Sequence, residues 1–482
     1  MTASPTDIAS HAAALPAILA AGGGGEMTFA IMLIALLGIG AQWIAWRVRM
    51  PSILLLLALG FAVGPGSAWL FGDEDRLLDP NAVFGDLLLP LVGVSVGLIL
   101  YEGGLTLRFS EIRGVARSVV MLVTVGALVT WALAALAGGW VLGLPVSLAV
   151  LLGAVLIVTG PTVIGPLLTH IRPAGQVGPT LKWEGIVIDP IGALAAVLTL
   201  EVILIGSAPE ATGSVALALV KTIVFGGGIG LLAAGAIVVL LERFLVPESL
   251  QNPVSLVFLI CAYTLSNAAQ AESGLLAATV MGIALANQTR IDTGHILEFK
   301  ENLRVLIIGV LFIVLAARID VDELLSVGLL PVLGFLGLMI VVVRPASVLL
   351  STIGGNLTWR ERLMICALAP RGIVAAAVSS VFALSLESAV AAGTIELESP
   401  GRLVSLTFLV IVGTVLFYGF FAPVAADLLR ISDKDPQGVV IIGASKLARV
   451  MAGALSRRGA RVLLVDTNRS NVTAARLEGL DA

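Results

Sequence analysis

Three charged side chains lie inside long apolar stretches of the sequence. Glu184 and Asp189 are five residues apart within the apolar segment 177–203, and Arg371 interrupts another apolar segment near the end of the chain. A charge at the centre of a bilayer costs about 2.5–3.5 kcal/mol even on the scale derived from membrane insertion. Such residues usually pair with an opposite charge or help to move an ion or a proton. These three residues are therefore the first candidates for chemistry.

Asp189 is the main candidate for a group that binds both a proton and a cation. A carboxylate removed from water is more stable when it holds a proton or a cation than when it stands alone. A proton and a monovalent cation can then compete for the same two oxygens, and this competition is by itself a mechanism of exchange. The alternative is a structural acid that is hydrogen-bonded to a neighbouring helix.

Glu184 is the partner that we expect for Arg371. A buried arginine needs a carboxylate, and pairing Arg371 with Glu184 leaves Asp189 free to titrate. The alternative for Arg371 is a side chain that extends to the membrane surface.

Glycine and proline break two of the apolar segments beside polar residues. Thr159-Gly160-Pro161 breaks the segment 146–170, and Pro370-Arg371-Gly372 breaks the segment 361–385. An unwound helix exposes carbonyl oxygens, and with hydroxyls these are the ligands that hard cations prefer. We therefore expect Thr159 to bind the cation together with Asp189, although a helix-capping role for Thr159 is compatible with this. Glycine and proline are also common in transmembrane helices in general.

Glu102 lies about two turns from the end of the apolar segment 84–107. It is a candidate for a funnel to the site or for a second ion- and proton-binding group. A side chain that merely reaches the membrane surface is an equal alternative.

The composition places these residues in an all-α polytopic membrane protein. The chain of 482 residues is 58% hydrophobic and 12% charged, whereas soluble domains contain about 25% charged residues. Apolar stretches of about 20 residues recur throughout. We expect about thirteen transmembrane helices, at 28–46, 52–70, 84–107, 117–137, 146–170, 178–203, 214–241, 253–269, 274–287, 303–318, 325–350, 361–385 and 401–424.

Lysine and arginine alternate between the two sides of these segments. The positive-inside rule puts the more basic side in the cytoplasm, and we assign Arg344 to a loop on that side. The N-terminal segment, 1–27, is then external and the C-terminus cytoplasmic. The transmembrane domain is expected to span 28–430.

The two breaks fall at matching positions. If the seventh segment is a connector, each broken segment is the fifth of six in its half. Two inverted six-helix repeats with discontinuous helices are typical of secondary transporters, whose binding sites lie at the breaks.

The C-terminal part changes in character after a polar linker, 431–437. Residues 438–482 read as strand, turn, helix and strand, the start of a Rossmann-like fold. Gly443 and Ser445 lie in the expected phosphate-binding turn, and Asp466 ends the second strand at the position that usually binds ribose. NAD(H) or an adenine nucleotide is the expected ligand. So short a segment cannot bury a core alone, so we expect the natural domain to be longer.

These motifs together resemble the bacterial monovalent cation:proton antiporters of the sodium/proton exchanger (NhaP-like) type, and the tail resembles a regulatory nucleotide-binding (TrkA-N/RCK-like) domain. The matching segments are 49–55, Gly60, Gly64-Pro65, 101–105, 159–161, Glu184, Asp189-Pro190, 272–277 and 370–372. The resemblance implies a homodimer with a scaffold of early and middle spans and a mobile core of spans four to six and eleven to thirteen. Two positions depart from the family pattern: Gly160 replaces an aspartate and Ile188 replaces an asparagine.

The expected function is electroneutral exchange of protons for Na+, with K+ or Li+ as further candidates, and no enzymatic activity. A nucleotide-regulated K+/H+ antiporter is the near alternative. A channel is disfavoured because no Thr-Val-Gly-Tyr-Gly filter exists, and a membrane sensor is disfavoured by the set of ion-site residues. We expect no required cofactor and no nucleic-acid partner; the partners are the cations, protons and the lipid membrane.

Overall fold

A computed structural model describes residues 25–48, 50, 52–71, 76–112, 114–205, 210–291, 294–319, 328–395, 397, 399–431 and 438–482. The chain divides into two compact units, Met1–Ile431 and Ser432–Ala482. Nearly all of the expected external segment and linker lies outside the described residues.

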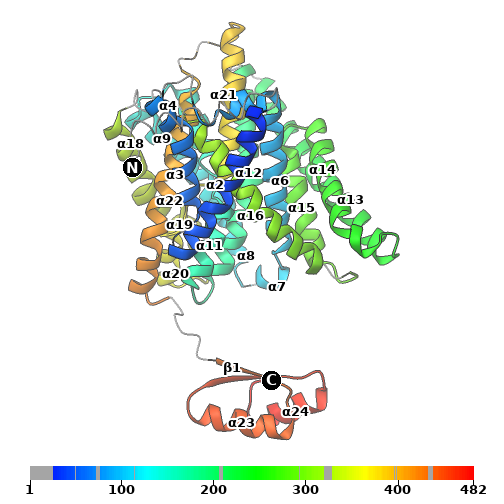
Figure 1. Ribbon diagram of the computed structural model, residues 1–482. Helices are drawn as coiled ribbons and strands as arrows, with labels where there is room; N and C mark the ends of the chain where they lie inside the picture. The colour runs from blue at the N-terminus through cyan, green and yellow to red at the C-terminus, as the bar shows by residue number, and fades with distance from the viewer. Residues whose placement is uncertain are drawn as a thin grey trace, which may run out of the picture. The chain divides into compact units, whose positions relative to one another are not determined.

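The first unit is a bundle of helices (Figure 1). Its first half contains α2 (Gly25–Val48), α3 (Ser52–Val63), α4 (Pro65–Phe71), α5 (Pro80–Phe84), α6 (Leu88–Leu105), α7 (Phe109–Ile112), α8 (Ala116–Met121), α9 (Ala127–Val141), α10 (Val146–Val155), α11 (Pro161–Ile171) and α12 (Val177–Ile205). The second half contains α13 (Glu210–Glu242), α14 (Gln251–Ala269), α15 (Ser273–Asn287), α16 (Gly294–Ala317), α18 (Leu329–Leu338), α19 (Arg344–Ser351), α20 (Trp359–Cys366), α21 (Ile373–Ala391) and α22 (Arg402–Leu428).

Ten helical stretches in the described part of the chain are long and apolar enough to cross a membrane. Three further expected spans correspond to helices that do not meet this description. They are the broken pair α10–α11, the short α15, and α16, which begins with a charged segment. The polytopic helical architecture is therefore established, and the count of thirteen spans stays a prediction.

Two helix breaks occur where the glycine and proline motifs predict them. Residues 156–160 separate α10 from α11, and residues 367–372 separate α20 from α21. Proline at the first position of α11 suits a helix start, because its missing N–H would have no partner there. Each break leaves the last carbonyls of the preceding helix without helical partners.

The structure adds a second pair of irregularities that the sequence did not predict. One π-helical turn, Leu122–Gly126, joins α8 to α9, and another, Met339–Val343, joins α18 to α19. The two π-containing helical stretches are in contact, because the Ser347 hydroxyl of α19 donates to the carbonyl of Gly126 at 2.9 Å. The π turns lie in the fourth expected span of each half, so they match in position as the breaks do.

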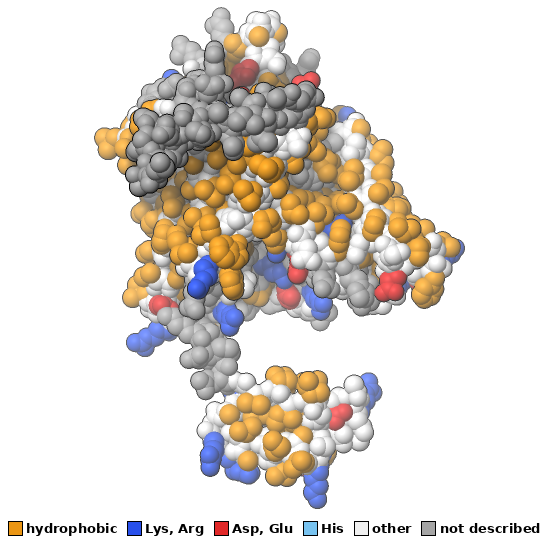
Figure 2. All heavy atoms as spheres, in the orientation of Figure 1, with side chains coloured by type: hydrophobic (Ala, Val, Ile, Leu, Met, Phe, Trp, Pro, Cys, Tyr) orange, Lys and Arg blue, Asp and Glu red, His pale blue; other side chains and the backbone are white. Residues whose placement is uncertain are grey.

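The surface of the first unit has the polarity of a membrane protein. Figure 2 shows a wide band of hydrophobic side chains on the visible face, with Lys and Arg side chains gathered toward the lower end of the bundle in that view. Large exposed apolar side chains on α2, α9 and α13 contribute to such a surface, among them Trp43, Trp140 and Leu232.

The second unit has a parallel β-α-β-α arrangement. Strands β1 (Gly438–Ile442) and β2 (Arg461–Val465) pair in parallel around α23 (Lys446–Arg457), and α24 (Arg469–Leu477) follows. Asp481 then forms a parallel bridge to Leu463 on the far side of β2. The described sheet thus has two parallel strands joined by a helix, and the start of a Rossmann-like fold stays a prediction.

Candidate functional site

The two helix breaks cross each other in direct backbone contact. The amide of Gly160 donates to the carbonyl of Pro370 at 2.9 Å. A Cβ atom at Gly160 would overlap the Cα of Gly372, and a Cβ at Gly372 would overlap the Cα of Gly160. Only glycine at both positions allows this approach. Gly160, where the family pattern expects an aspartate, therefore lies at a crossing that leaves no room for a side chain.

Arg371 is hydrogen-bonded to the unwound backbone of the first break. Its Nη1 donates to the carbonyls of Ile157 and Val158, both at 3.2 Å. These carbonyls follow the end of α10, where the helix has unwound. A cation at the C-terminal end of a helix also interacts favourably with the helix dipole. Arg371 is buried, and no carboxylate pairs with it within the described ranges of the chain.

Arg344 performs the corresponding role at the second break. It donates to the carbonyl of Ile365 at 3.3 Å and to that of Leu368 at 3.2 Å, at the end of α20. It also forms a bidentate ion pair with Glu184, with distances of 2.5 and 3.0 Å. All these groups are buried, so the pair is closed off from solvent.

Two sequence-based predictions are therefore wrong. The partner of Glu184 is Arg344 and not Arg371. The two terminal nitrogens of Arg344, Nη1 and Nη2, both donate to the Glu184 carboxylate. Arg371 donates instead to carbonyls that follow the end of α10. Arg344 does not lie in a loop, because α18, the π turn and α19 form one continuous helical stretch through it. The missed signal was the apolar sequence on both sides of Val343-Arg344-Pro345.

Asp189 is completely buried, and neither of its carboxylate oxygens has a hydrogen-bond partner. It lies on α12 between Gly185 and Gly192, a spacing that puts all three residues on one face of a helix. A Cβ at Gly185 would lie 3.6 Å from the Cα of Pro161, and one at Gly192 would lie 3.3 Å from the amide nitrogen of Val158. The face that carries Asp189 thus packs against the first break.

Thr159 is the polar side chain among residues 156–160 of the first break. Its hydroxyl oxygen is buried and has no hydrogen-bond partner, and it does not cap α11, whose preceding residue is Gly160. The capping alternative for Thr159 is therefore wrong. Pro190 adds a further oxygen, because a proline inside α12 cannot donate to the carbonyl of Ile186 one turn earlier. Buried oxygens without partners are rare and unfavourable, and both Thr159 and Asp189 carry such oxygens.

Glu102 is buried on α6 and forms an ion pair with Arg304 of α16, with 3.1 Å between Oε1 and Nη1. Both residues line a cavity of about 680 Å³, which also reaches Pro161 at the break and Ile186 on α12. Lys182 and Thr106 also line this cavity. Glu102 is thus part of the approach to the crossing, and its partner Arg304 was not identified from the sequence.

The approach from the opposite end of the bundle is narrow. A cavity of about 60 Å³ lies between α6, α15 and α21, and Glu272 and Tyr263 are among its lining residues. Of these two cavities, the one lined by Glu102 and Lys182 is the larger, and it is the one that reaches Pro161 at the first break.

The second unit brings together the three residues predicted to bind a nucleotide. Gly443 has a φ of 96°, a left-handed conformation that favours glycine. The Ser445 side chain caps α23 by accepting from the amide of Ala448 at 3.4 Å. Asp466 accepts from the amides of Asn468 and Ala444, each at 2.8 Å, and from the Asn471 side chain at 2.9 Å. These hydrogen bonds lower the pKa of Asp466, and they occupy the oxygens expected to bind ribose.

Crossed discontinuous helices around a buried carboxylate define a membrane protein of the secondary-transporter class. A profile described as "Sodium/hydrogen exchanger, transmembrane" matches residues 31–426. The chain therefore belongs to the sodium/hydrogen exchanger family.

Similar proteins agree with this assignment. The K(+)/H(+) antiporter NhaP of Alkalimonas amylolytica is 30% identical over 351 residues, which are 71% of this chain and 58% of that protein. The Na(+)/H(+) antiporter 1 of Methanocaldococcus jannaschii is 28% identical over 371 residues, 72% of this chain and 81% of that protein. The structure of the sodium proton antiporter MjNhaP1 from the same organism matches with a TM-score of 0.67 at 22% identity, covering 84% of this chain and 99% of that one.

Because Glu184 and Arg344 form a buried ion pair, we expect the stability losses caused by replacing each of them to be strongly coupled. Arg344→Ala and Glu184→Ala should each destabilise the protein by about 3–5 kcal/mol, because each leaves a buried charge alone. The double variant should lose less than the sum of the two. The measurement is the midpoint of thermal unfolding in detergent.

Arg371 supplies the matched control for this cycle. Arg371→Ala and Glu184→Ala should couple much less strongly than Arg344→Ala and Glu184→Ala, because Arg371 and Glu184 form no ion pair. Coupling between Glu184 and Arg371, with additivity between Glu184 and Arg344, would contradict the observed pairing.

The backbone crossing predicts that Gly160→Ala destabilises the protein by about 1–3 kcal/mol or more, because the new methyl group overlaps Gly372. Gly165→Ala is the control, since a Cβ there meets no atom within 4 Å. Thermal unfolding of the two variants checks this, and equal midpoints would show that the crossing does not require glycine.

Proposed function

We propose that this chain exchanges protons for a monovalent cation across the bacterial inner membrane by alternating access. Na+ is the proposed cation, with K+ and Li+ as alternatives. The observation that carries the proposal is Asp189, whose two oxygens are fully buried beside the helix crossing and have no protein partner. In this position a proton or a cation must stabilise the carboxylate.

The proposed binding set consists of Asp189, Thr159 and carbonyl oxygens at the break. Oxygen ligands of this kind suit a small hard cation. Binding a proton or a cation to Asp189 satisfies the same group, so the two compete for it. The names of the relatives, which include both Na(+)/H(+) and K(+)/H(+) antiporters, support the class of substrate and leave the choice of cation to experiment.

The two cavities support one state of the transport cycle. The cavity with Glu102 is about 680 Å³, while the one at the opposite end is about 60 Å³. We propose that the former faces the cytoplasm, in accord with the positive-inside rule, and that movement of a core containing α10–α12 and α20–α21 reverses the access. In this orientation the N-terminus is external and the C-terminus cytoplasmic. We also propose that the chain, with its thirteen expected spans, forms a homodimer, as its resemblance to these antiporters implies.

The charge count supports electroneutral exchange. Glu184 is paired with Arg344 and Glu102 with Arg304, so Asp189 is the buried carboxylate left to change its occupant near the crossing. One proton or one monovalent cation gives the loaded site the same charge. Net charge moved per cycle is then zero.

For the second unit we propose a regulatory role as a nucleotide-binding domain, with NAD(H) or an adenine nucleotide as the ligand. The parallel strands, the turn at Gly443 and the position of Asp466 support this. Because Asp466 is already hydrogen-bonded within the turn, a ribose would have to share its oxygens.

Asp189→Asn should abolish exchange while the protein still folds, because an amide neither titrates nor carries the charge that holds a cation. Purified protein is reconstituted in liposomes with an internal pH dye, and Na+, K+ or Li+ is added outside. Asp86→Asn, at an exposed position, should exchange like the parent. Cation-driven proton flux in Asp189→Asn above that of protein-free liposomes would refute the assignment.

Exchange should also be independent of membrane potential. A potential acts on net charge moved, with about 2.3 kcal/mol per charge per 100 mV. The test compares exchange rates in liposomes with imposed potentials, set by valinomycin and potassium or by another ionophore pair if K+ is a substrate. A rate that changes with potential would show that a second group titrates, and Glu102→Gln would then be expected to remove the dependence.

A further inference from the structure

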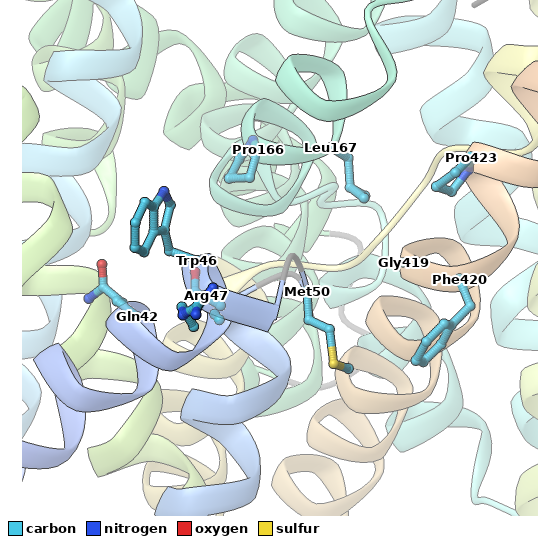
Figure 3. A pocket seen from close by; sticks show the side chains of 11 residues that line it. Gln42, Trp46, Arg47, Met50, Pro166, Leu167, Gly419, Phe420 and Pro423 are labelled. Atoms are coloured by element: carbon cyan, nitrogen blue, oxygen red, sulfur yellow. The ribbon is translucent and has the colours of Figure 1, made fainter. Parts of the chain in front are cut away.

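A groove separate from the Glu102 cavity opens on the other side of α11. Its volume is about 740 Å³. The end of α2 and the start of α3 form one wall, and α11 and α22 form the other (Figure 3). The lining residues are Gln42, Ala45, Trp46, Arg47, Met50, Ser52, Pro166, Leu167, Gly419, Phe420 and Pro423.

Most of the residues that line this groove are apolar, and Arg47 is the charged residue among them. Trp46 is 75% exposed and Phe420 is 60% exposed. Arg47 is in the last turn of α2 and is also exposed. No acidic residue lines the groove, and no ion pair or hydrogen bond of the Arg47 side chain occurs within the described ranges. The groove therefore combines an uncovered apolar floor with an unneutralised cation.

We propose that this groove binds an anionic glycerophospholipid, with its phosphate at Arg47 and an acyl chain along Phe420, Pro423 and Leu167. Helix α2, the stretch Ser52–Leu70 formed by α3 and α4, and helix α22 are long and apolar enough to span the membrane, so lipid has direct access to the space between them. Arginine binds phosphate through two parallel hydrogen bonds. Tryptophan at a helix end is typical of the level of the lipid headgroups. Basic pockets between transmembrane helices are known to take anionic headgroups.

The bound lipid would act on the half-helix that follows the first break. Pro166 on α11 lines both this groove and the cavity that contains Glu102. One side of α11 therefore faces the approach to the crossing, and the other side faces the groove. An acyl chain in the groove fills the space between α11 and the end of α2. This role is additional to cation exchange and does not depend on which cation is transported.

Native mass spectrometry of the purified full chain in detergent tests the proposal. The protein is mixed with equal amounts of phosphatidylglycerol and phosphatidylethanolamine. The parent should retain phosphatidylglycerol in preference, and Arg47→Glu should lower this retention by roughly tenfold, because it replaces attraction to the phosphate by repulsion. Gly419→Phe should reduce retention of both lipids, since it fills the groove without changing charge.

Arg243→Glu is the matched control, because Arg243 is an exposed arginine at the end of another long apolar helix, α13. It should retain phosphatidylglycerol like the parent. Equal retention by the parent and Arg47→Glu, or no preference for phosphatidylglycerol in the parent, would overturn the proposal. A disulfide-linked dimer formed by Phe420→Cys and not by the parent would show that a second copy occupies the groove, and would overturn it as well.

Discussion

The buried carbonyl groups at the two helix breaks are the constraint on which the rest of the structure depends. A membrane interior offers no water to satisfy a backbone group, so irregular backbone persists there only when protein groups bond to it. Arg371 donates to the carbonyls freed after α10, and Arg344 donates to those freed at the end of α20. The two arginines thus make two adjacent breaks possible, and the breaks bring Gly160 and Gly372 into contact.

The pairing of Arg344 distinguishes the two acidic residues of α12, Glu184 and Asp189. Arg344 is balanced by Glu184 through a bidentate pair, so this carboxylate serves the structure. Asp189 has no such partner, although it is on the same helix only five residues away. A shift of five residues turns a side chain by about 140° around the helix axis. The two acids of α12 consequently face different neighbours, and the same helix carries one paired carboxylate and one without a protein partner.

Helix α11 lies between two cavities, one of which reaches the helix crossing. This half-helix begins at the break and has a cavity on each side, with Pro166 lining both. A helix packed loosely on two sides can move as a unit more readily than one packed on all sides, because fewer buried contacts must be exchanged. The arrangement agrees with the movement of a core containing α10–α12 that we propose for alternating access.

Much of this organisation follows from the sequence alone. The apolar segments, the two breaks and the presence of Asp189 inside a span are local properties, since composition and the glycine and proline positions determine them over a few residues. The family also follows from such local motifs. The tertiary structure alone decided which charges meet. Glu184 and Arg344 are 160 residues apart, and a choice between Arg344 and Arg371 depends on how helices from the two halves pack. The π turn before Arg344, the Arg304 partner of Glu102 and the groove beside Arg47 likewise arise from packing between distant segments, which no local pattern in the chain specifies.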